Sequence, residues 1–397
     1  MKRLLLLFSI CIIAIGTTTA KPNNKSLIGR VLPSWSEGYL DIHTISTGRG
    51  ECLLIVMPDG TSLVVDAGEF SRISKKYTNV KQRPDNNTRP TKALADYIRH
   101  FIPHKEAIDY LNISHFHMDH MGGLEPEYKL YTEGDYILSG VTALYHNLPF
   151  REVIDRAYPD YDSLAVKAMA TLPLANYRKF LAHQKEFGLK ASRFELGAVN
   201  QFAMRYNPTA YPNFKIENVC SNGYVWENGK MANIYDDGGL RENAASCGFV
   251  VRYGDFDFLT AGDIGDGHNF EYRVAKVVGK VEAIKAHHHL SPHSMHESAM
   301  EILVPKVMSV TSFYNREIQP DQKKFDYITD LGCKIFCTSI GEEMLKIYPS
   351  AYTRCNSTSG HIVFRVEPNG KRFWVYVLDD FDNEYRITKV VGPLKSK

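Results

Sequence analysis

The amino-acid sequence predicts a mixed α+β fold, and three features of the chain predict it. Short apolar runs typical of buried strands recur along its 397 residues, and tight turns such as Gly254-Asp255 and Asn369-Gly370 join several of them. Amphipathic helical patterns lie between these runs, and a group of histidine and aspartate residues directly follows one expected strand. A formal charge of +2 with 23% charged residues argues against a general nucleic-acid coat and against disorder.

The first 20 residues are expected to form a secretory signal peptide. A charged start, MKR, precedes an apolar run over residues 4–15 and a small-residue cleavage site, Thr18-x-Ala20. The run is too short to span a bilayer, and no later stretch approaches the roughly 20 apolar residues that a membrane helix needs. The mature chain, residues 21–397, is therefore expected to be exported by a bacterial cell, as a periplasmic or secreted protein without a membrane span.

Six cysteines remain in the mature chain, and they are too sparse for a disulfide scaffold. The chain contains no CxxC pattern, so a zinc finger is not predicted either. Cys333 and Cys337 fall on one face of an expected strand, and we interpret them as packed thiols.

The elements before the histidine group are expected to run strand, turn, strand, helix, strand. LDIHTISTGRGECLLIVMP and SLVVDAG are the first expected strands, and the second ends at Asp66. A basic segment from Arg72 to Lys92 follows, which we expect either on the functional face or as a solvated loop. KALADYIRHF has the spacing of an amphipathic helix. AIDYLNIS then reads as a buried strand, which places the histidines at a strand end.

Residues 124–240 differ from the rest and are expected to form a helical insertion. They are rich in aromatic residues, and one helix is expected over LANYRKFLAHQKEF, ended by Gly188. The aromatic side chains are expected to pack a subdomain core, with a lid over the site as the alternative.

The elements after this insertion return to strands and hairpins. ASCGFVVRYGDFDFLTAGD predicts a hairpin, and KVEAIKAHHHLSPHS predicts a strand that ends in a second histidine group. KVMSVTSFY and CKIFCTS are expected strands on either side of a helix, QKKFDYITDLG. The last hairpin is HIVFRVEPNGKRFWVYVLDD.

The stretch HFHMDH contains four metal-ligand residue types within six positions. His115 and His117 lie at i and i+2 in an extended loop, so their side chains point the same way and can share one metal. Asp119 and His120 begin the following helix and can serve a second metal. Imidazole and carboxylate together suit zinc, manganese or iron. The alternative is a group of solvated surface histidines, which the position after a buried strand disfavours.

The order of these motifs resembles that of the metallo-β-lactamase superfamily. HFHMDH matches the HxHxDH signature of that family, and DAG at Asp66 is similar to its first motif. FLTAGD ends at Asp263, where the family has its bridging carboxylate, and AHHHLS places His288 and His289 where it has its last histidine. The resemblance implies an αβ/βα four-layer sandwich, two mixed β-sheets flanked by helices. It also implies one domain, with a core at about 36–123 and 241–385.

A nearer resemblance is to the hydrolase domain of ComEC-type competence proteins. It rests on TGRGECLLIVMPDGTSLVVDAG, KAHHHLS and LVPKVMSVTSFYNREIQP, and on ENAASCGFVVRYGDFDFLTAGD, where Asn243 and Ser246 occupy the N-x-x-S positions. It covers roughly residues 39–123 and 243–366. It does not cover the insertion, and the chain lacks the membrane channel of that family.

The resemblance implies two divalent metal ions, with zinc expected first and manganese as the alternative. Its implied ligands are His115 and His117 for metal one, Asp119, His120 and one of His288 or His289 for metal two, and Asp263 between the metals. Asn243 stands where other members have a further histidine, so metal one is expected to be held more weakly, with water completing its shell. Asp66, Asn243 and Ser246 are expected to support the site. For Asp66 the alternative is a strand-end carboxylate that caps backbone donors.

These ligands imply a metal-dependent hydrolase that uses a metal-bridged hydroxide, with Asp119 and Asp263 as its catalytic carboxylates. Because the basic segment follows the Asp66 strand, a phosphodiester is the first expected substrate, either a small molecule or a nucleic acid. A lactone or amide hydrolase is the alternative enzyme. The alternative outside enzymes is a metal-poor binding module without turnover. No obligate protein partner is evident. Lys285 is expected at a strand edge, and His293 and His296 either at the surface or as donors to the site.

Overall fold

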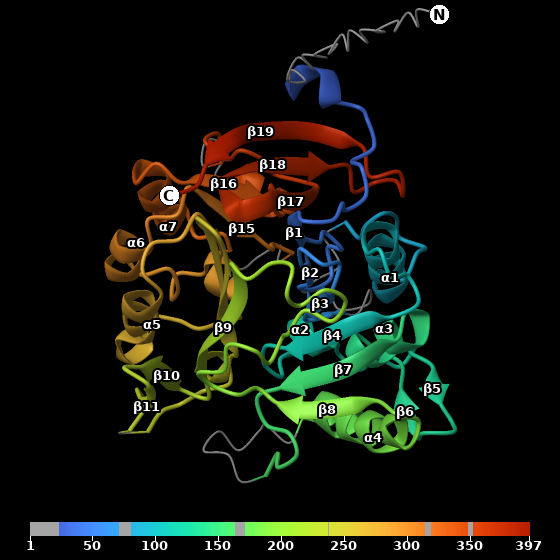
Figure 1. The fold of residues 1–397 in the computed structure, drawn as a ribbon. Helices are drawn as coiled ribbons and strands as arrows, with labels where there is room; N and C mark the ends of the chain where they lie inside the picture. Colours follow the sequence, from blue (N-terminus) through green and yellow to red (C-terminus); the bar gives the residue numbers. More distant parts are fainter. Residues whose placement is uncertain (1–23, 71–80, 163–170, 237, 314–318, 348–351) are drawn as a thin grey trace, which may run out of the picture.

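The computed structural model describes residues 24–70, 81–162, 171–236, 238–313, 319–347 and 352–397 (Figure 1). The expected signal peptide and residues 72–80 of the basic segment lie outside these described residues. Two large mixed β-sheets and the helices around them make up the described chain, which confirms the α+β class. Within the described ranges, no helix is long and apolar enough to cross a membrane.

Nine strands of the described chain form the first sheet, in the order β19-β18-β17-β1-β2-β3-β4-β7-β8. Their bounds are β1 (Leu40–Thr44), β2 (Leu53–Val56), β3 (Ser62–Val65), β4 (Ile108–Ile113), β7 (Phe150–Asp155), β8 (Lys190–Arg193), β17 (His361–Val366), β18 (Arg372–Leu378) and β19 (Ile387–Lys395). Neighbouring strands are antiparallel from β19 to β3 and parallel from β3 to β8.

Eight strands of the described ranges form the second sheet, in the order β11-β10-β9-β12-β13-β14-β15-β16. Their bounds are β9 (Phe214–Ser221), β10 (Tyr224–Glu227), β11 (Lys230–Asn233), β12 (Gly248–Tyr253), β13 (Phe256–Thr260), β14 (Ala283–Lys285), β15 (Val307–Val310) and β16 (Lys334–Cys337). The strands are antiparallel up to β13 and parallel from β13 to β16. A separate small hairpin joins β5 (Leu130–Tyr131) to β6 (Tyr136–Ile137).

The two sheets pack face to face between two groups of helices (Figure 1). Helices α1 (Pro90–Phe101), α3 (Val141–Asn147) and α4 (Leu172–Glu186) cover the outer face of the first sheet. Helices α5 (Phe270–Val278), α6 (Glu297–Leu303), α7 (Gln322–Asp330) and α8 (Glu342–Ile347) contribute to the core outside the second sheet. The result is a layered sandwich of helices, sheet, sheet and helices.

Alternation along the strands explains why the sequence shows continuous apolar runs. In β2, Leu53 and Ile55 belong to the core between the sheets, whereas Leu54 and Val56 belong to the core under the helices. Successive side chains of a strand point to opposite faces, so a strand that is covered on both faces is apolar throughout. The strands and helices expected from these runs are present, except that LDIHTISTGRGECLLIVMP contains two antiparallel strands, β1 and β2, where one was expected. The sequence patterns also did not predict β19.

The expectation that residues 124–240 form a helical insertion is wrong in one respect. The segment does contain α3 and α4, but it also supplies β7 and β8 to the first sheet and β9, β10 and β11 to the second. Its strand β7 pairs with β4, which precedes the HFHMDH stretch, and its strand β9 pairs with β12, which follows Asn243 and Ser246. Tyr161, Tyr177 and Phe180 are buried, as the core interpretation of its aromatic residues predicts. The segment is thus built into the sandwich.

The sandwich brings the motifs together because each follows the carboxyl end of a strand. Asp66 follows β3, and the HFHMDH stretch follows β4, in the first sheet. Asp263 follows β13 and the second histidine group follows β14, in the second sheet. The edges of the two facing sheets therefore assemble one site from segments about 200 residues apart in the sequence.

Candidate metal centre

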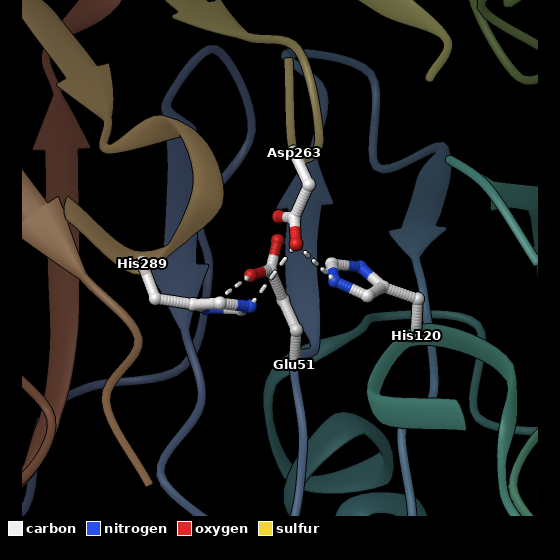
Figure 2. Close-up of side chains that lie close together, drawn as sticks. All are labelled: Glu51, His120, Asp263 and His289. Carbon is white, nitrogen blue, oxygen red and sulfur yellow. Dashed lines mark ion pairs between the residues drawn. The ribbon is translucent and has the colours of Figure 1, made fainter. Parts of the chain in front are cut away.

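Four ligand atoms converge around one point at the centre of the site. Oδ2 of Asp263 lies 3.2 Å from Nε2 of His120 and 3.3 Å from Nε2 of His289. Oδ2 of Asp119 lies 3.6 Å and 3.2 Å from the same two nitrogens. His120 and His289 are fully buried, and Figure 2 shows their rings on opposite sides of Asp263. Two imidazoles and two carboxylates at this spacing match the ligands that zinc or manganese takes.

Further histidine nitrogens, from His115, His117 and His288, lie near the same carboxylate. Nε2 of His115 is 3.0 Å from Nδ1 of His117 and 3.9 Å from Oδ2 of Asp263. Nε2 of His288 is 4.0 Å from the same carboxylate oxygen and 3.2 Å from Nδ2 of Asn243. The sequence left a choice between His288 and His289, and the structure places both beside Asp263, in different groups.

The backbone of residues 287–290 explains how the adjacent residues His288 and His289 face different ligands. His288, His289 and Leu290 all have positive φ, at 45°, 54° and 58°. Three successive residues other than glycine in this region are uncommon, and such strain concentrates at functional sites. His287 turns away from the centre, and its Nδ1 lies 2.8 Å from Oε1 of Glu271.

Asp66 supports the first histidine group without facing the centre itself. Its Oδ2 lies 2.8 Å from Nδ1 of His120 and also accepts a hydrogen bond from Oγ of Ser114. Its Oδ1 accepts from the backbone N–H of Ser114. Both interpretations offered for Asp66 are therefore realised, because one carboxylate orients a histidine and also satisfies a backbone donor. Such contacts fix the ring so that its other nitrogen faces the site.

Close backbone approach fixes the start of α2 (Met118–Met121). A Cβ atom at Gly68 would lie 1.8 Å from the carbonyl oxygen of Asp119, so only glycine fits there. Asp263 is held similarly from the second sheet, because its backbone N–H donates to Oγ of buried Ser246 at 3.1 Å. Ser246 thus fixes the backbone position of Asp263.

Glu51 and Lys285 are buried parts of this site that sequence reasoning missed. Oε2 of Glu51 lies 2.5 Å from Nζ of Lys285. The same oxygen lies 3.3 Å from Nδ1 of His289 (Figure 2). The expectation that Lys285 lies at a strand edge is wrong, because β14 runs between β13 and β15 and the side chain is fully buried. The sequence did contain a sign of this role, because Lys285 is a charged residue within the apolar run of an inner strand.

Glu51 could be counted as a metal ligand, since its carboxylate oxygen lies within 4.8 Å of the ligand atoms of His120, Asp263 and His289. Its contacts favour a different role. Glu51 approaches Nδ1 of His289, whereas Nε2 of that ring faces the centre, and Lys285 already neutralises its charge. Glu51 is therefore placed to orient His289, as Asp66 orients His120.

A second buried ion pair connects the HFHMDH stretch to residue 243. Arg156, just after β7, forms a two-pronged pair with Glu242, at 2.9 Å and 2.5 Å. Oε1 of Glu242 also accepts from the backbone N–H of Phe116 at 2.8 Å. Because Asn243 adjoins Glu242, this pair holds together the two segments that carry His117 and Asn243. No sequence motif pointed to Arg156.

The charges in the site shift the pKa values of its histidines in opposite directions. Burial disfavours the charged ring of His289, but Asp263 and Asp119 outweigh burial and raise its pKa to about 9. Asp263 and Asp119 likewise raise the pKa of His120 well above its usual range, against burial. Burial and the nearby His120 instead lower the pKa of His115 well below its usual range. In the absence of a metal, protons on His120 and His289 therefore balance the two carboxylates.

Several buried side-chain atoms of the site have no hydrogen-bond partner among the described residues. They include Nε2 of His120, Oδ1 of Asp263 and Oδ1 of Asn243. Buried polar atoms are almost always paired, so a cluster of unpaired ones around histidines and carboxylates fits a bound cation. The donor set and these unpaired atoms therefore fit the expected metal ions.

A cavity of about 310 Å³ opens over the site. Its polar lining residues are His117, Asp119, Thr171, Asn243, Asp263 and His288. Its apolar walls are Phe70, Phe116, Met118 and Pro173, and no lysine or arginine lines it in the part of the chain that the structure describes. The cavity therefore combines a ligand-rich floor with apolar walls.

The described part of the basic segment does not face this cavity. Arg83 pairs with Asp380 at 2.9 Å, and Arg89 pairs with Glu69 at 2.8 Å. Lys81 lies 3.4 Å from a carboxylate oxygen of Glu342 and is mostly exposed. These cations serve structural or surface ion pairs, and residues 72–80 lie outside the described chain. His293 and His296 are exposed, in line with their surface interpretation.

Comparison of the chain with models of known protein families and with curated proteins gives no match. A functional assignment therefore depends on the residues and geometry of the site itself.

Proposed function

We propose that this chain is a metal-dependent hydrolase of the metallo-β-lactamase superfamily, nearest to the ComEC-type hydrolase domains. One observation carries the proposal. Oδ2 of Asp263 lies within 3.2–4.0 Å of Nε2 of four histidines, so two metal ions held by these histidines could share this carboxylate. The histidines are His115, His120, His288 and His289. The layered sandwich and the order of the motifs support the same family.

The residues divide into two ligand sets around Asp263. We assign Asp119, His120 and His289 to metal two, and His115, His117 and His288 to metal one. His288 then takes the place of the histidine that Asn243 replaces, so metal one has more protein ligands than the sequence suggested. Two divalent ions bound there would act as Lewis acids on an ester and lower the pKa of a bound water.

Residues of the chain orient the histidine ligands and exclude water from one side of the cavity. Asp66 and Glu51 hold the rings of His120 and His289 by their outer nitrogens. His117 and Asn243 line the cavity beside the ligands, so a substrate meets polar groups that are already in position. The walls of Phe70 and Phe116 shield one side from solvent, which strengthens electrostatic contacts inside.

A phosphodiester or other anionic ester remains the first proposed substrate because two divalent cations would attract its charge, although the described basic residues do not line the cavity. The apolar walls support an ester that carries one compact apolar or aromatic group, because the cavity of about 310 Å³ offers such a group a place beside the ligands. The same walls favour a lactone or amide as the second candidate. A binding module without turnover is disfavoured by the additional ligand His288. We further propose that the protein is exported, as its first 20 residues suggest.

Metal content and turnover of the same preparations test the proposal. We expect two equivalents of zinc or manganese by elemental analysis, and hydrolysis of bis(4-nitrophenyl) phosphate that chelation abolishes. Asp263→Asn should lose both metal and activity, whereas His293→Ala, an exposed histidine of the same segment, should keep both. Turnover of a lactone without turnover of the phosphodiester would select the second candidate. Absence of bound metal at saturating zinc and manganese would refute the proposal.

A further inference from the structure

Two cysteine thiols meet at the edge of the eight-stranded sheet, and neither belongs to the metal centre. Sγ of Cys355 lies 3.7 Å from Sγ of Cys337, the last residue of edge strand β16. A disulfide bond is about 2.05 Å long, so the sulfurs need to approach by only about 1.7 Å. This proximity was not predicted, because 17 residues separate the two cysteines (residues 338–354).

Backbone contacts hold the two cysteines in this arrangement. The N–H of Cys337 donates to the carbonyl of Ser357 at 2.8 Å, and the N–H of Asn356 donates to the carbonyl of Ile335 at 2.7 Å. The two residues that follow Cys355 are thus attached to β16. The thiols are therefore kept close by main-chain hydrogen bonds, and their proximity does not depend on side-chain packing alone.

The two thiols differ in access and in acidity. Cys337 is fully buried, whereas Cys355 is partly exposed. The Cys337 thiol lowers the pKa of Cys355 by hydrogen bonding, and the nearby Lys389 adds to this effect. Conversely, Cys355 and burial raise the pKa of Cys337 well above its usual range. A partly exposed thiol that ionises more readily, next to a buried one, is the arrangement of an attacking and a resolving cysteine.

We propose that Cys337 and Cys355 are a disulfide-forming pair that reacts with small-molecule disulfides of the glutathione type. The Cys355 thiolate attacks one sulfur of oxidised glutathione, forms a mixed disulfide and releases one glutathione thiolate. The Cys337 thiol then gives up its proton and attacks Sγ of Cys355, which releases the second glutathione thiolate and leaves the intramolecular disulfide. Two protein thiols are oxidised and one glutathione disulfide is reduced, so the electrons balance.

Tryptic mapping of the folded protein tests this pairing directly. Trypsin cuts after Lys334, Lys346, Arg354 and Arg365, so Cys337 and Cys355 fall in separate peptides, residues 335–346 and 355–365. After incubation of the folded protein with oxidised glutathione and alkylation of free thiols, we expect these two peptides to be joined. Cys333, in peptide 325–334, should be recovered in alkylated form, as expected of a thiol that stayed reduced, and serves as the internal control.

Single substitutions separate the two roles. In Cys337→Ser, we expect Cys355 to retain a glutathione adduct, because the resolving thiol is absent. In Cys355→Ser, we expect Cys337 to stay reduced, because it is buried. Cys333→Ser should leave the crosslink unchanged. The oxidised wild-type protein should unfold at a Tm about 4 °C higher than the reduced form.

Two results would overturn the proposal. One is that both peptides keep free thiols in the folded protein while the urea-unfolded chain oxidises in the same buffer. The other is that Cys355 pairs with a different cysteine. The inference does not depend on the metal centre, so it stands or falls separately from the proposed hydrolase activity.

Discussion

Nζ of Lys285 lies 2.5 Å from Oε2 of Glu51, with both side chains buried beside the metal centre. Lys285 follows two apolar residues of β14, and Glu51 belongs to the other sheet's loop before β2, so the pair connects the two sheets. Because Glu51 also faces His289, the pair links the packing of the sandwich to the orientation of a ligand.

Removing the lysine should therefore destabilise the protein strongly. Lys285→Met leaves the Glu51 carboxylate buried without a partner, and we expect a loss of about 3–5 kcal/mol in the free energy of unfolding. Urea denaturation of the metal-free protein measures it. Lys179→Met is the matched control, because its pair with Asp135, at 2.6 Å, is exposed on both sides, and it should cost less than about 1 kcal/mol. Equal losses in the free energy of unfolding would show that the buried pair contributes no more to stability than the exposed one.

Each of the two adjacent histidines is expected to hold a different metal ion. His288→Ala should remove the metal of the His115 group, and His289→Ala should remove the metal of the His120 group, so each variant should bind about one equivalent. Elemental analysis and titration with zinc measure the stoichiometry. If His288→Ala retained two equivalents while His289→Ala lost both, His288 would not be a ligand.

Asp66 should contribute to metal affinity without binding metal. Asp66→Asn weakens the contact that orients His120, and we expect the dissociation constant of metal two to rise about 10–100-fold with unchanged stoichiometry. Competition with a chelator of known affinity measures it. Loss of a full equivalent would instead make Asp66 a ligand.

Metal binding should release protons. The carboxylates keep His120 and His289 protonated in the metal-free protein, and a metal requires neutral imidazoles. Affinity for zinc should therefore rise between pH 7 and 9. Calorimetry in two buffers of different ionisation enthalpy counts the released protons, and identical apparent enthalpies in both buffers would show that none is released.

A histidine outside the site should make the protein acid-labile. Burial lowers the pKa of His361 from 6.5 to about 3, while the ring accepts a hydrogen bond from the backbone N–H of Ser46. The unfolded chain therefore binds the proton more readily, so stability present above pH 6.5 is lost as the pH falls toward 3. We expect this residue to account for about 4–5 kcal/mol of that loss.

His361→Asn isolates this effect, because its Oδ1 can accept the same hydrogen bond but does not titrate. Its free energy of unfolding, measured in urea from pH 7 to 4, should decline less steeply than that of the wild-type protein. Parallel curves would show that His361 is not the group that titrates.

From the sequence, we predicted the strands and helices outside residues 124–240 that carry clear apolar patterns, the helix α4 within that segment, and the candidate ligands that follow two of those strands. Continuous apolar runs predicted the inner strands, because a strand covered on both faces must be apolar throughout, and helical spacing predicted α1, α4 and α7. HFHMDH and AHHHLS identified ligand candidates by their chemical type and their positions after strands. These are local properties, and a chain expresses them without reference to distant segments.

How these residues are distributed around Asp263 depends on the tertiary structure. Whether His288 or His289 faces a given partner depends on three successive residues with positive φ, which no spacing rule indicates. The roles of Glu51, Lys285 and Arg156 arise from contacts across the sandwich, between residues 86 to 234 positions apart in the sequence (156 to 242, and 51 to 285). A buried charge needs a partner of opposite sign, and only the packing of the two sheets determines which one lies within reach.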